Sequence, residues 1–534
     1  MTPRNGTGVT PPGASRAGNG QRPGRDRRAV LHPPRAGRPR PEGQPPRVAV
    51  VGGGIAGVAA AVALAERGVR VQLLERERQL GGRLRGWPTT LADGSPVTMS
   101  RGFHAFFRQY YNLRALLRRA DPLGRALAPM PDYPLIDAEG HRDTFQGLPR
   151  TPPWNALAFA LFSPTFRWWD LATRIDPVAA LPLVDVSVPE IYRRLDDQDA
   201  MTFLERVRFP DAARHLAFSV FSRSFFADPR RLSAAELATM FHIYFLGSAE
   251  GLVFDVPTEP FPRALWEPMG DYLAEIGVTV RAGVAVEQVV PGRERRFAVR
   301  TGGDGYGGEE VDAVVLAADI TGLQALLAAS PELGAAPWRA QIARLRTAPP
   351  FLVSRLWLES PVRPDRPGFL GTSGFGPLDN VSVWERFEGE AARWARRTGG
   401  SVVELHAYAL TPEMTTDPER GKRRLVEELR RVYPETATAT ILDERHELHA
   451  DCPLFAPGTF GDRPGVTTGD PAVVLAGDLT RVDLPVALME RATTSGFLAA
   501  DALLGGWGLR GHPLWTVPVR GRLAPLRAAA SRFG

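Results

Sequence analysis

A glycine-rich segment near the start of the chain has the residue types and the spacing of a dinucleotide-binding site. Gly52, Gly54 and Gly57 form the pattern GxGxxG directly after the apolar residues 48–51. The first glycine allows a tight turn, and the second, which lacks a Cβ atom, lets the backbone approach a pyrophosphate. Gly57 lets the following helix pack on the strand, so the phosphates lie at the amide end of that helix.

An acidic residue follows at the distance that a ribose contact requires. Residues 69–73 alternate as a second strand would, and Glu75 ends this strand about 20 residues beyond the glycines. A carboxylate in this place can accept both ribose hydroxyls. Because strand, helix, second strand and carboxylate are in register, we predict that Ile55, Ala56 and Arg76 also lie against the dinucleotide.

The other end of the chain carries a second motif that could complete such a site. An apolar run at 472–476 predicts a strand, Gly477 and Asp478 follow it, and residues 488–504 have the apolar periodicity of a helix. The two motifs lie at opposite ends of the sequence, which predicts a domain that is discontinuous along the chain.

Both motifs resemble those of FAD-containing amine oxidases and carotene desaturases. Glu75 followed by Gly81, Gly82 and Arg83 is similar to the ExxxxxGGR extension of that family. The resemblance implies FAD as cofactor. It also implies roles for the matching residues: Gly82 and Arg83 reach the pyrophosphate and the flavin, Asp478 binds a ribityl hydroxyl, the helix start near Met489 points its amides at the flavin, and the backbone of Val286 holds the adenine.

Residues 101–119 indicate a more specific relationship within that family. Their sequence is RGFHAFFRQYYNLRALLRR. They are similar to a segment of plant-type phytoene and ζ-carotene desaturases, and they match the isorenieratene synthase family of carotenoid φ-ring synthases more closely. That likeness extends over residues 47–505. It implies an FAD-dependent oxidoreductase that desaturates the β-ionone ring of β-carotene while one geminal methyl group migrates.

This reaction passes through a carbocation that must be shielded from water. We predict that the rings of Phe103, Phe106, Phe107, Tyr110 and Tyr111 stabilise the cation, and that His104 accepts the proton that restores the double bond. Core packing of the five rings and a structural role for the histidine remain alternatives, in which case Glu259 and Glu490 are the next candidates for the base.

Three other functions remain open. The nearest is a desaturase or cis-trans isomerase of acyclic carotenes, and the next is an amine oxidase. The third is a nucleic-acid binder with a basic tail, although we expect no nucleic-acid partner. Only the GxGxxG pattern that begins at Gly52 lies between a predicted strand and a predicted helix, so a quinone or oxygen is the expected electron acceptor rather than a built-in NAD(P)H domain.

The elements that position these residues are predicted to form an α/β protein. Its 534 residues exceed the size of one core, so we expect a Rossmann-like FAD-binding domain with an inserted α+β substrate domain. The predicted FAD domain comprises residues 47–105, 271–330 and 466–505, and the substrate domain comprises 106–270 and 331–465. Residues 506–534 form a basic C-terminal extension.

Composition also gives predictions about the N-terminal tail, about metal binding and about contact with a membrane. Residues 1–46 hold nine arginines against Asp26 and Glu42 and few large apolar residues, which predicts a disordered basic tail. Cys452 is the single cysteine, and we expect no metal site. A carotenoid must be drawn from a bilayer, so the aromatic residues 154–169 are expected to contact the inner face of the cell membrane from the cytoplasm without spanning it.

Overall fold

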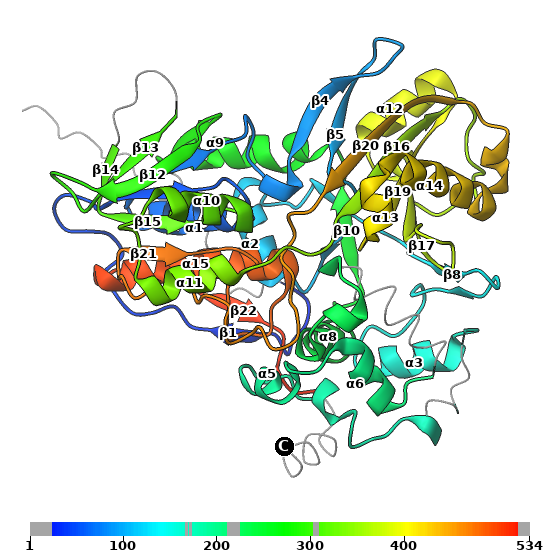
Figure 1. Ribbon diagram of the computed structural model, residues 1–534, viewed down its shortest axis with the longest axis horizontal. Helices are drawn as coiled ribbons and strands as arrows, with labels where there is room; N and C mark the ends of the chain where they lie inside the picture. Colours follow the sequence, from blue (N-terminus) through cyan, green and yellow to red (C-terminus); the bar gives the residue numbers. More distant parts are fainter. Residues whose placement is uncertain (1–23, 166–168, 170–172, 211–224, 303–308, 522–534) are drawn as a thin grey trace, which may run out of the picture.

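The computed structural model describes residues 24–165, 169, 173–210, 225–302 and 309–521. Two halves lie side by side in Figure 1. One contains the sheet that carries the glycine-rich motif, and the other contains a larger sheet with helices beside and below it. This arrangement confirms the predicted α/β class with a Rossmann-like domain and an inserted substrate domain.

The first half is built on a five-stranded parallel sheet. Its order is β11 (Thr279–Ala282), β3 (Arg70–Glu75), β2 (Arg47–Val51), β15 (Ala313–Leu316) and β21 (Val473–Leu475). The central strands are nearly continuous apolar runs, as expected for a parallel sheet covered on both faces. Pairing of β21 with β15 joins the C-terminal motif to the N-terminal one.

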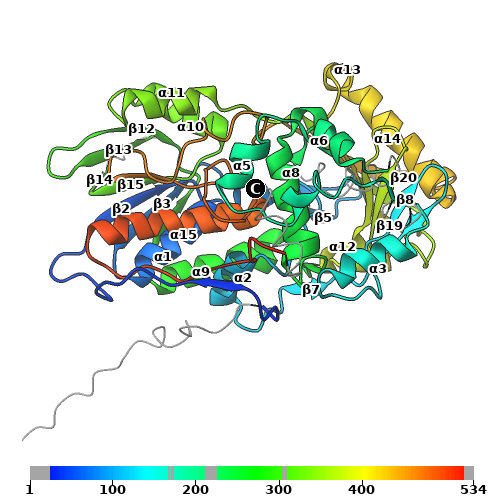
Figure 2. The same ribbon diagram turned by 90° about the horizontal axis from the view of Figure 1, so that it is seen from below.

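Two helices cover this sheet and pack closely on each other. α1 (Ile55–Glu66) is rich in alanine and buried over nearly its whole surface, and α15 (Leu488–Gly506) runs beside it (Figure 2). A Cβ atom on Gly57 would lie 1.9 Å from the carbonyl oxygen of Gly52. A Cβ atom on Gly496 would lie 2.3 Å from the carbonyl oxygen of Ala56, so the approach of α15 to α1 requires a glycine.

Further elements complete this half. They are the strands β12 (Val286–Pro291), β13 (Phe297–Thr301) and β14 (Glu309–Val311), and the helices α2 (Tyr111–Ala120), α9 (Glu267–Glu275), α10 (Ile320–Ala329) and α11 (Ala336–Arg344). Leu113 and Leu116 of α2 and Trp338 of α11 pack in its core. The sequence placed α2 and α11 in the substrate domain, but both helices bury apolar side chains in the half that carries the five-stranded sheet.

The second half contains a seven-stranded sheet. Its order is β20 (Ile441–His449), β16 (Phe351–Leu358), β19 (Ser401–Ala407), β18 (Asn380–Val383), β17 (Phe369–Ser373), β8 (Leu135–Asp137) and β9 (Arg142–Asp143). The helices beside it are α12 (Gly389–Thr398), α13 (Pro412–Thr416) and α14 (Pro418–Val432). The strands expected in the predicted substrate domain are present at β16, β19 and β20.

A lower group of helices and two small sheets connect the halves (Figure 1). The helices are α3 (Trp154–Phe162), α5 (Glu190–Leu195), α6 (Ala200–Val207) and α8 (Ala234–Phe241). The small sheets are the hairpin of β4 (Gly86–Thr90) with β5 (Pro96–Ser100), and the group of β6 (Phe106–Phe107), β10 (Phe254–Pro257) and β7 (Leu127–Pro129).

Residues 24–46 are ordered, so the prediction of a disordered tail is wrong for this part; residues 1–23 lie outside the described residues. β1 (Val30–His32) pairs antiparallel with β22 (Leu514–Thr516) of the predicted C-terminal extension. Asp26 is buried, and its backbone N–H donates to the Glu250 carboxylate over 3.1 Å. Backbone pairing orders this segment, although it contributes few apolar side chains.

We expect Gly496→Ala to destabilise the protein, because its methyl group would collide with the backbone of α1. Overpacking of this kind costs about 1 to 3 kcal/mol, which thermal unfolding will show as a lower Tm. Gly506→Ala is the control. Gly506 lies on the same helix, and a Cβ atom there meets no atom of another element within 4 Å. An unchanged Tm for Gly496→Ala would mean that the two helices can separate without cost.

Candidate active site

The glycine loop leaves room for a pyrophosphate. Gly52 has a φ of +109°, which turns the chain at the end of β2, and its N–H donates to the carbonyl oxygen of Leu74 in β3 over 2.8 Å. The Gly81 N–H donates to the carbonyl oxygen of Gly53 over 2.8 Å, so the second glycine pair lies beside the first loop. A Cβ atom on Gly54 would meet only the Cα atom of Gly82, at 3.8 Å. The space above Gly54 is thus bounded by backbone on one side and is open on the other, as phosphates require.

Glu75 lies at the end of β3, where the ribose is expected. Its carboxylate accepts the Gly53 N–H over 2.6 Å and the Glu77 N–H over 2.8 Å. The carbonyl oxygen of Glu75 accepts the N–H of Val284, which brings the start of β12 and Val286 close to this strand end. Glu75 and Val286 therefore flank one region, which fits the adenosine half of FAD; Arg76 is exposed beside it.

The C-terminal motif closes the other end of the cradle. Arg83 donates to the Asp478 carboxylate over 2.5 Å, which joins the two motifs directly. Gly477 has a φ of +147° and donates its N–H to Ser495 of α15 over 2.9 Å. No side chain caps the first turn of α15, where Met489 lies. The free amides of this turn suit the electronegative edge of a flavin ring.

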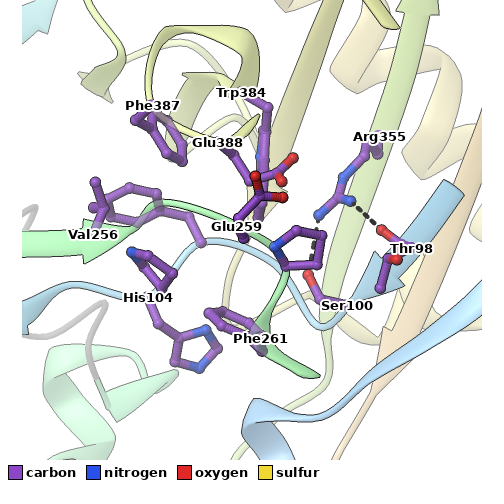
Figure 3. A pocket seen from close by; sticks show the side chains of 13 residues that line it. Thr98, Ser100, His104, Val256, Glu259, Phe261, Arg355, Trp384, Phe387 and Glu388 are labelled. Atoms are coloured by element: carbon purple, nitrogen blue, oxygen red, sulfur yellow. Dashed lines mark hydrogen bonds between the residues drawn. The ribbon is translucent and has the colours of Figure 1, made fainter. Parts of the chain in front are cut away.

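A cavity is lined by side chains from β5, β10, β16 and the start of α12 (Figure 3). The space between its lining atoms is about 380 Å³, and this figure includes space that is open to solvent. Its aromatic lining residues are Phe103, His104, Phe261, Trp384 and Phe387. The segment after Phe261 leads to Trp266, whose indole N–H donates to the carbonyl oxygen of Leu84 over 2.9 Å. This contact places the cavity next to the Gly82–Arg83 segment.

A buried ion pair supports one wall of the cavity. Arg355 donates to Glu404 over 2.7 Å, and its guanidinium lies 3.9 Å from the ring centre of Trp384. Glu404 also accepts the N–H of Phe103 over 2.9 Å and contacts His406 over 2.7 Å. Burial raises the pKa of Glu404, but attraction to Arg355 and His406 lowers it to about 2. The pair therefore holds the backbone of Phe103 in place while remaining charged.

Two carboxyl groups also line the cavity. The sequence pointed to one of them, Glu259, as an alternative base, and it gave no role to the other, Glu388. Figure 3 shows Glu259 and Glu388 on the side opposite His104 and Phe261. Glu259 is bound by Arg393 over 2.7 and 2.8 Å, which lowers its pKa. Burial raises the pKa of Glu388 to about 7. The sequence offers one signal for Glu388, its position directly before a helix, and that signal indicates a cap rather than a cavity.

The structure does not bring the five predicted aromatic residues together around one carbon. Phe103 and His104 line the cavity, but Phe106 and Tyr111 are fully buried in two different cores. Phe107 packs against the ring of Tyr244 at 4.5 Å between ring centres. Of the five rings, that of Phe103 is the one that lines this cavity, and the shielding role of the five rings stays a prediction.

Tyr110 lies at a second, smaller cavity. Its hydroxyl group is 2.6 Å from that of Tyr244, and Glu490 lines the same space. Glu490 accepts the N–H groups of Asn112 and Leu113 over 2.8 and 2.9 Å, and burial raises its pKa to about 8. This glutamate thus anchors the start of α2 on α15.

The imidazole ring of His104 is in its neutral form near neutral pH. Its Nδ1 lies 2.9 Å from the carbonyl oxygen of Gly102, which can only accept a hydrogen bond, so Nδ1 carries the proton and Nε2 is left as an acceptor. Burial lowers the pKa of His104 to about 4.

Comparison with known proteins agrees with this geometry. Residues 55–504 match the family described as flavin containing amine oxidoreductase. The chain is 63% identical to a carotenoid phi-ring synthase of Streptomyces griseus, over 96% of this chain and 98% of that one. It is 27% identical to a carotenoid phi-ring synthase of Chlorobaculum tepidum, over 90% and 92% of the two chains. A zeta-carotene desaturase of Synechocystis is 25% identical, over 86% and 97%.

Solved structures share the fold. Putrescine oxidase bound to putrescine superimposes with a TM-score of 0.60 at 15% identity, covering 86% of this chain and 99% of that one. An oxidoreductase from Methanosarcina mazei also gives 0.60, at 14% identity, covering 84% and 98%. At these identities the likeness concerns the fold alone.

We expect Gly54→Ala to lose flavin without unfolding. Its methyl group meets no protein atom closer than 3.8 Å, so the apoprotein should keep its Tm, while the approach of the pyrophosphate is blocked. The ratio of flavin to protein absorbance after purification should fall at least about tenfold, the effect of a loss of about 1.4 kcal/mol. Gly270→Ala, whose Cβ atom meets no atom within 4 Å, is the matched control. Normal flavin content in Gly54→Ala would show that the phosphates bind elsewhere.

Proposed function

The chain belongs to the flavin-containing amine oxidoreductase family and, within it, to the carotenoid phi-ring synthases, and on this basis we propose that it converts the β-ring of a carotenoid such as β-carotene into an aromatic φ-ring with migration of one methyl group. The observation that carries this proposal is the 63% identity, over nearly the full length of both chains, with the phi-ring synthase of Streptomyces griseus. The aromatic cavity beside the cradle gives the proposal a physical site.

We propose FAD as the flavin. Glu75 and Val286 lie together at the end of β3, where an adenosine half would be held, and a smaller flavin nucleotide would leave this region without a ligand. When bound, the flavin supplies the oxidising power by accepting a hydride, roughly twice for each ring that becomes aromatic. A quinone or oxygen stays our prediction for the final electron acceptor.

The cavity suits the ring end of a long polyene rather than the whole molecule. The rings of Phe103, Phe261, Trp384 and Phe387 present apolar surface to a hydrocarbon ring. Their π faces also stabilise positive charge on carbon, and their packing keeps water from capturing it. The ion pair of Arg355 and Glu404 fixes the position of Phe103, so these walls are rigid before substrate arrives.

We propose that α3 contacts the membrane from which the substrate comes. Trp154, Leu157 and Leu161 share one face of this helix and are each more than half exposed, as is Phe162 at its end, whereas Asn155 and Phe159 are buried. Exposed apolar side chains gathered on one helix face favour an interfacial position. Among the described residues no helix is long and apolar enough to cross a bilayer. A location on the cytoplasmic side stays a prediction.

Expression in cells that accumulate β-carotene tests the reaction. We expect a pigment with the carbon count of β-carotene, fewer hydrogens and an aromatic ring end, identified by mass and absorption. The purified protein should show the absorption of oxidised FAD, with AMP released on phosphodiesterase treatment of the extracted cofactor. Conversion of phytoene or lycopene with unchanged β-carotene would instead identify an acyclic carotene desaturase.

Flotation with phospholipid vesicles tests the membrane contact. Burial of one Leu or Phe side chain contributes about 1.5 to 3 kcal/mol, so Leu157→Ser combined with Phe162→Ser should lower the vesicle-bound fraction at least about tenfold. Leu123→Ser is the control, because Leu123 is equally exposed but lies outside α3. Equal binding by the double variant and the wild type would exclude α3 as the contact.

A further inference from the structure

Glu388 is a buried carboxyl group that lines the cavity, and no Lys, Arg or His among the described residues forms an ion pair with it. The side chain is 4% exposed and lines the cavity with Phe387 and Phe261. Its two oxygens accept the N–H groups of Glu390 and Ala391 at the start of α12, over 2.7 and 2.8 Å. Each carboxylate oxygen has a second lone pair, so these bonds leave acceptor capacity toward the cavity.

The two other carboxylates that face this part of the cavity, Glu259 and Glu404, are held by basic side chains. Glu259 is held by both terminal nitrogens of Arg393, and Glu404 is held by Arg355 and His406. A proton placed on either of them would break an ion pair. Glu388 can take a proton without breaking an ion pair, because the hydrogen bonds that hold it come from backbone amides.

The proposed reaction requires a proton acceptor at this place. Removal of a hydride leaves a ring carbon without its electron pair, and a methyl group then migrates with its own pair from the neighbouring carbon. The positive charge moves to the carbon that the methyl group left. A neighbouring C–H bond must then break, its electron pair forming the new double bond, and the proton must leave before water reaches the cation.

We propose that Glu388 is the catalytic base that accepts this proton, and that its carboxylate also stabilises the preceding cation by charge attraction. This inference rests on the proposed function. The aromatic walls would hold the ring, flavin would supply the hydride acceptor when bound, and the released proton passes to a carboxylate oxygen of Glu388.

The alternative acceptor, His104, lies on the opposite side of the cavity. Its Nε2 can accept a proton, but burial lowers its pKa to about 4, whereas burial raises that of Glu388 to about 7. The difference between 7 and 4 is about three units, or about 10³-fold in proton affinity. Unlike the carboxylate, a neutral imidazole also carries no charge with which to attract a cation.

The charged groups around Glu388 set the pH range. Glu390 raises its pKa by repulsion, Arg355 lowers it, and Arg393 and Glu259 form a neutral pair close by. The base is protonated, and thus inactive, below about pH 7 and ionised above it. Product formation should therefore rise with pH and reach a plateau above an inflection near pH 7.

The test uses the flavin-loaded enzyme and β-carotene in detergent micelles, with aromatic product measured by chromatography between pH 5.5 and 9, a range of about two to three units around the inflection. Glu388→Gln should form product about 10²-fold more slowly and lose the inflection. Glu259→Gln is the control from the same cavity, and we expect it to keep the inflection.

A pair of shorter variants separates catalysis from capping. Aspartate and asparagine cap a helix equally well, so Glu388→Asp and Glu388→Asn should have similar Tm values. We expect only the aspartate variant to keep a pH-dependent rate. Equal rates and profiles for this pair, or a wild-type profile in Glu388→Gln, would overturn the proposal. Loss of the inflection in His104→Ala alone would make His104 the base. Absence of aromatic product with the wild type would overturn the proposed function itself, before any variant is measured.

Discussion

The close approach of α1, β2 and α15 is the constraint on which the cofactor-binding half depends. Gly57 lets α1 lie against the turn at Gly52, and Gly496 lets α15 lie against the backbone of α1 at Ala56. These contacts are between backbones, so no larger side chain could replace either glycine without moving a helix. Because both helix starts are thereby fixed at the end of one parallel sheet, the glycine loop and the Gly477–Asp478 turn form a single cradle, although they stand far apart in the sequence.

The two ligand-binding regions of the molecule use opposite electrostatics. The cradle offers free helix amides and the Arg83–Asp478 pair, which suit phosphates and the polar edge of a flavin. The neighbouring cavity offers aromatic rings and the unpaired carboxyl group of Glu388, which suit a hydrocarbon that becomes positively charged. The Arg355–Glu404 pair supports the wall of the cavity at Phe103. It adds no net charge, because the charges of the two partners cancel. A reaction that removes a hydride on one side and a proton on the other fits this division.

The cradle could be predicted from the sequence, because its parts are local. Strand, glycine loop, helix and Glu75 follow one another within a short stretch, and each has a characteristic period or spacing. The cavity could not, because its walls come from β5, β10, β16 and the start of α12, and only the packed fold brings them together. Residues 24–46 show another limit. Their composition indicates disorder, but the pairing of β1 with β22 is made by backbone groups, which composition does not report.

The position of Glu388 also explains why a capping residue can serve as a base. The first amides of α12 favour its ionised form, but removal from water disfavours that form more, and the second effect dominates. The amides fix the orientation of the carboxylate, so it needs no arginine to hold it. An arginine there would lower the proton affinity, as Arg393 does for Glu259, and would repel a cation in the cavity. A helix start therefore provides a means of holding a carboxylate rigidly in an apolar wall while keeping it able to accept a proton near neutral pH.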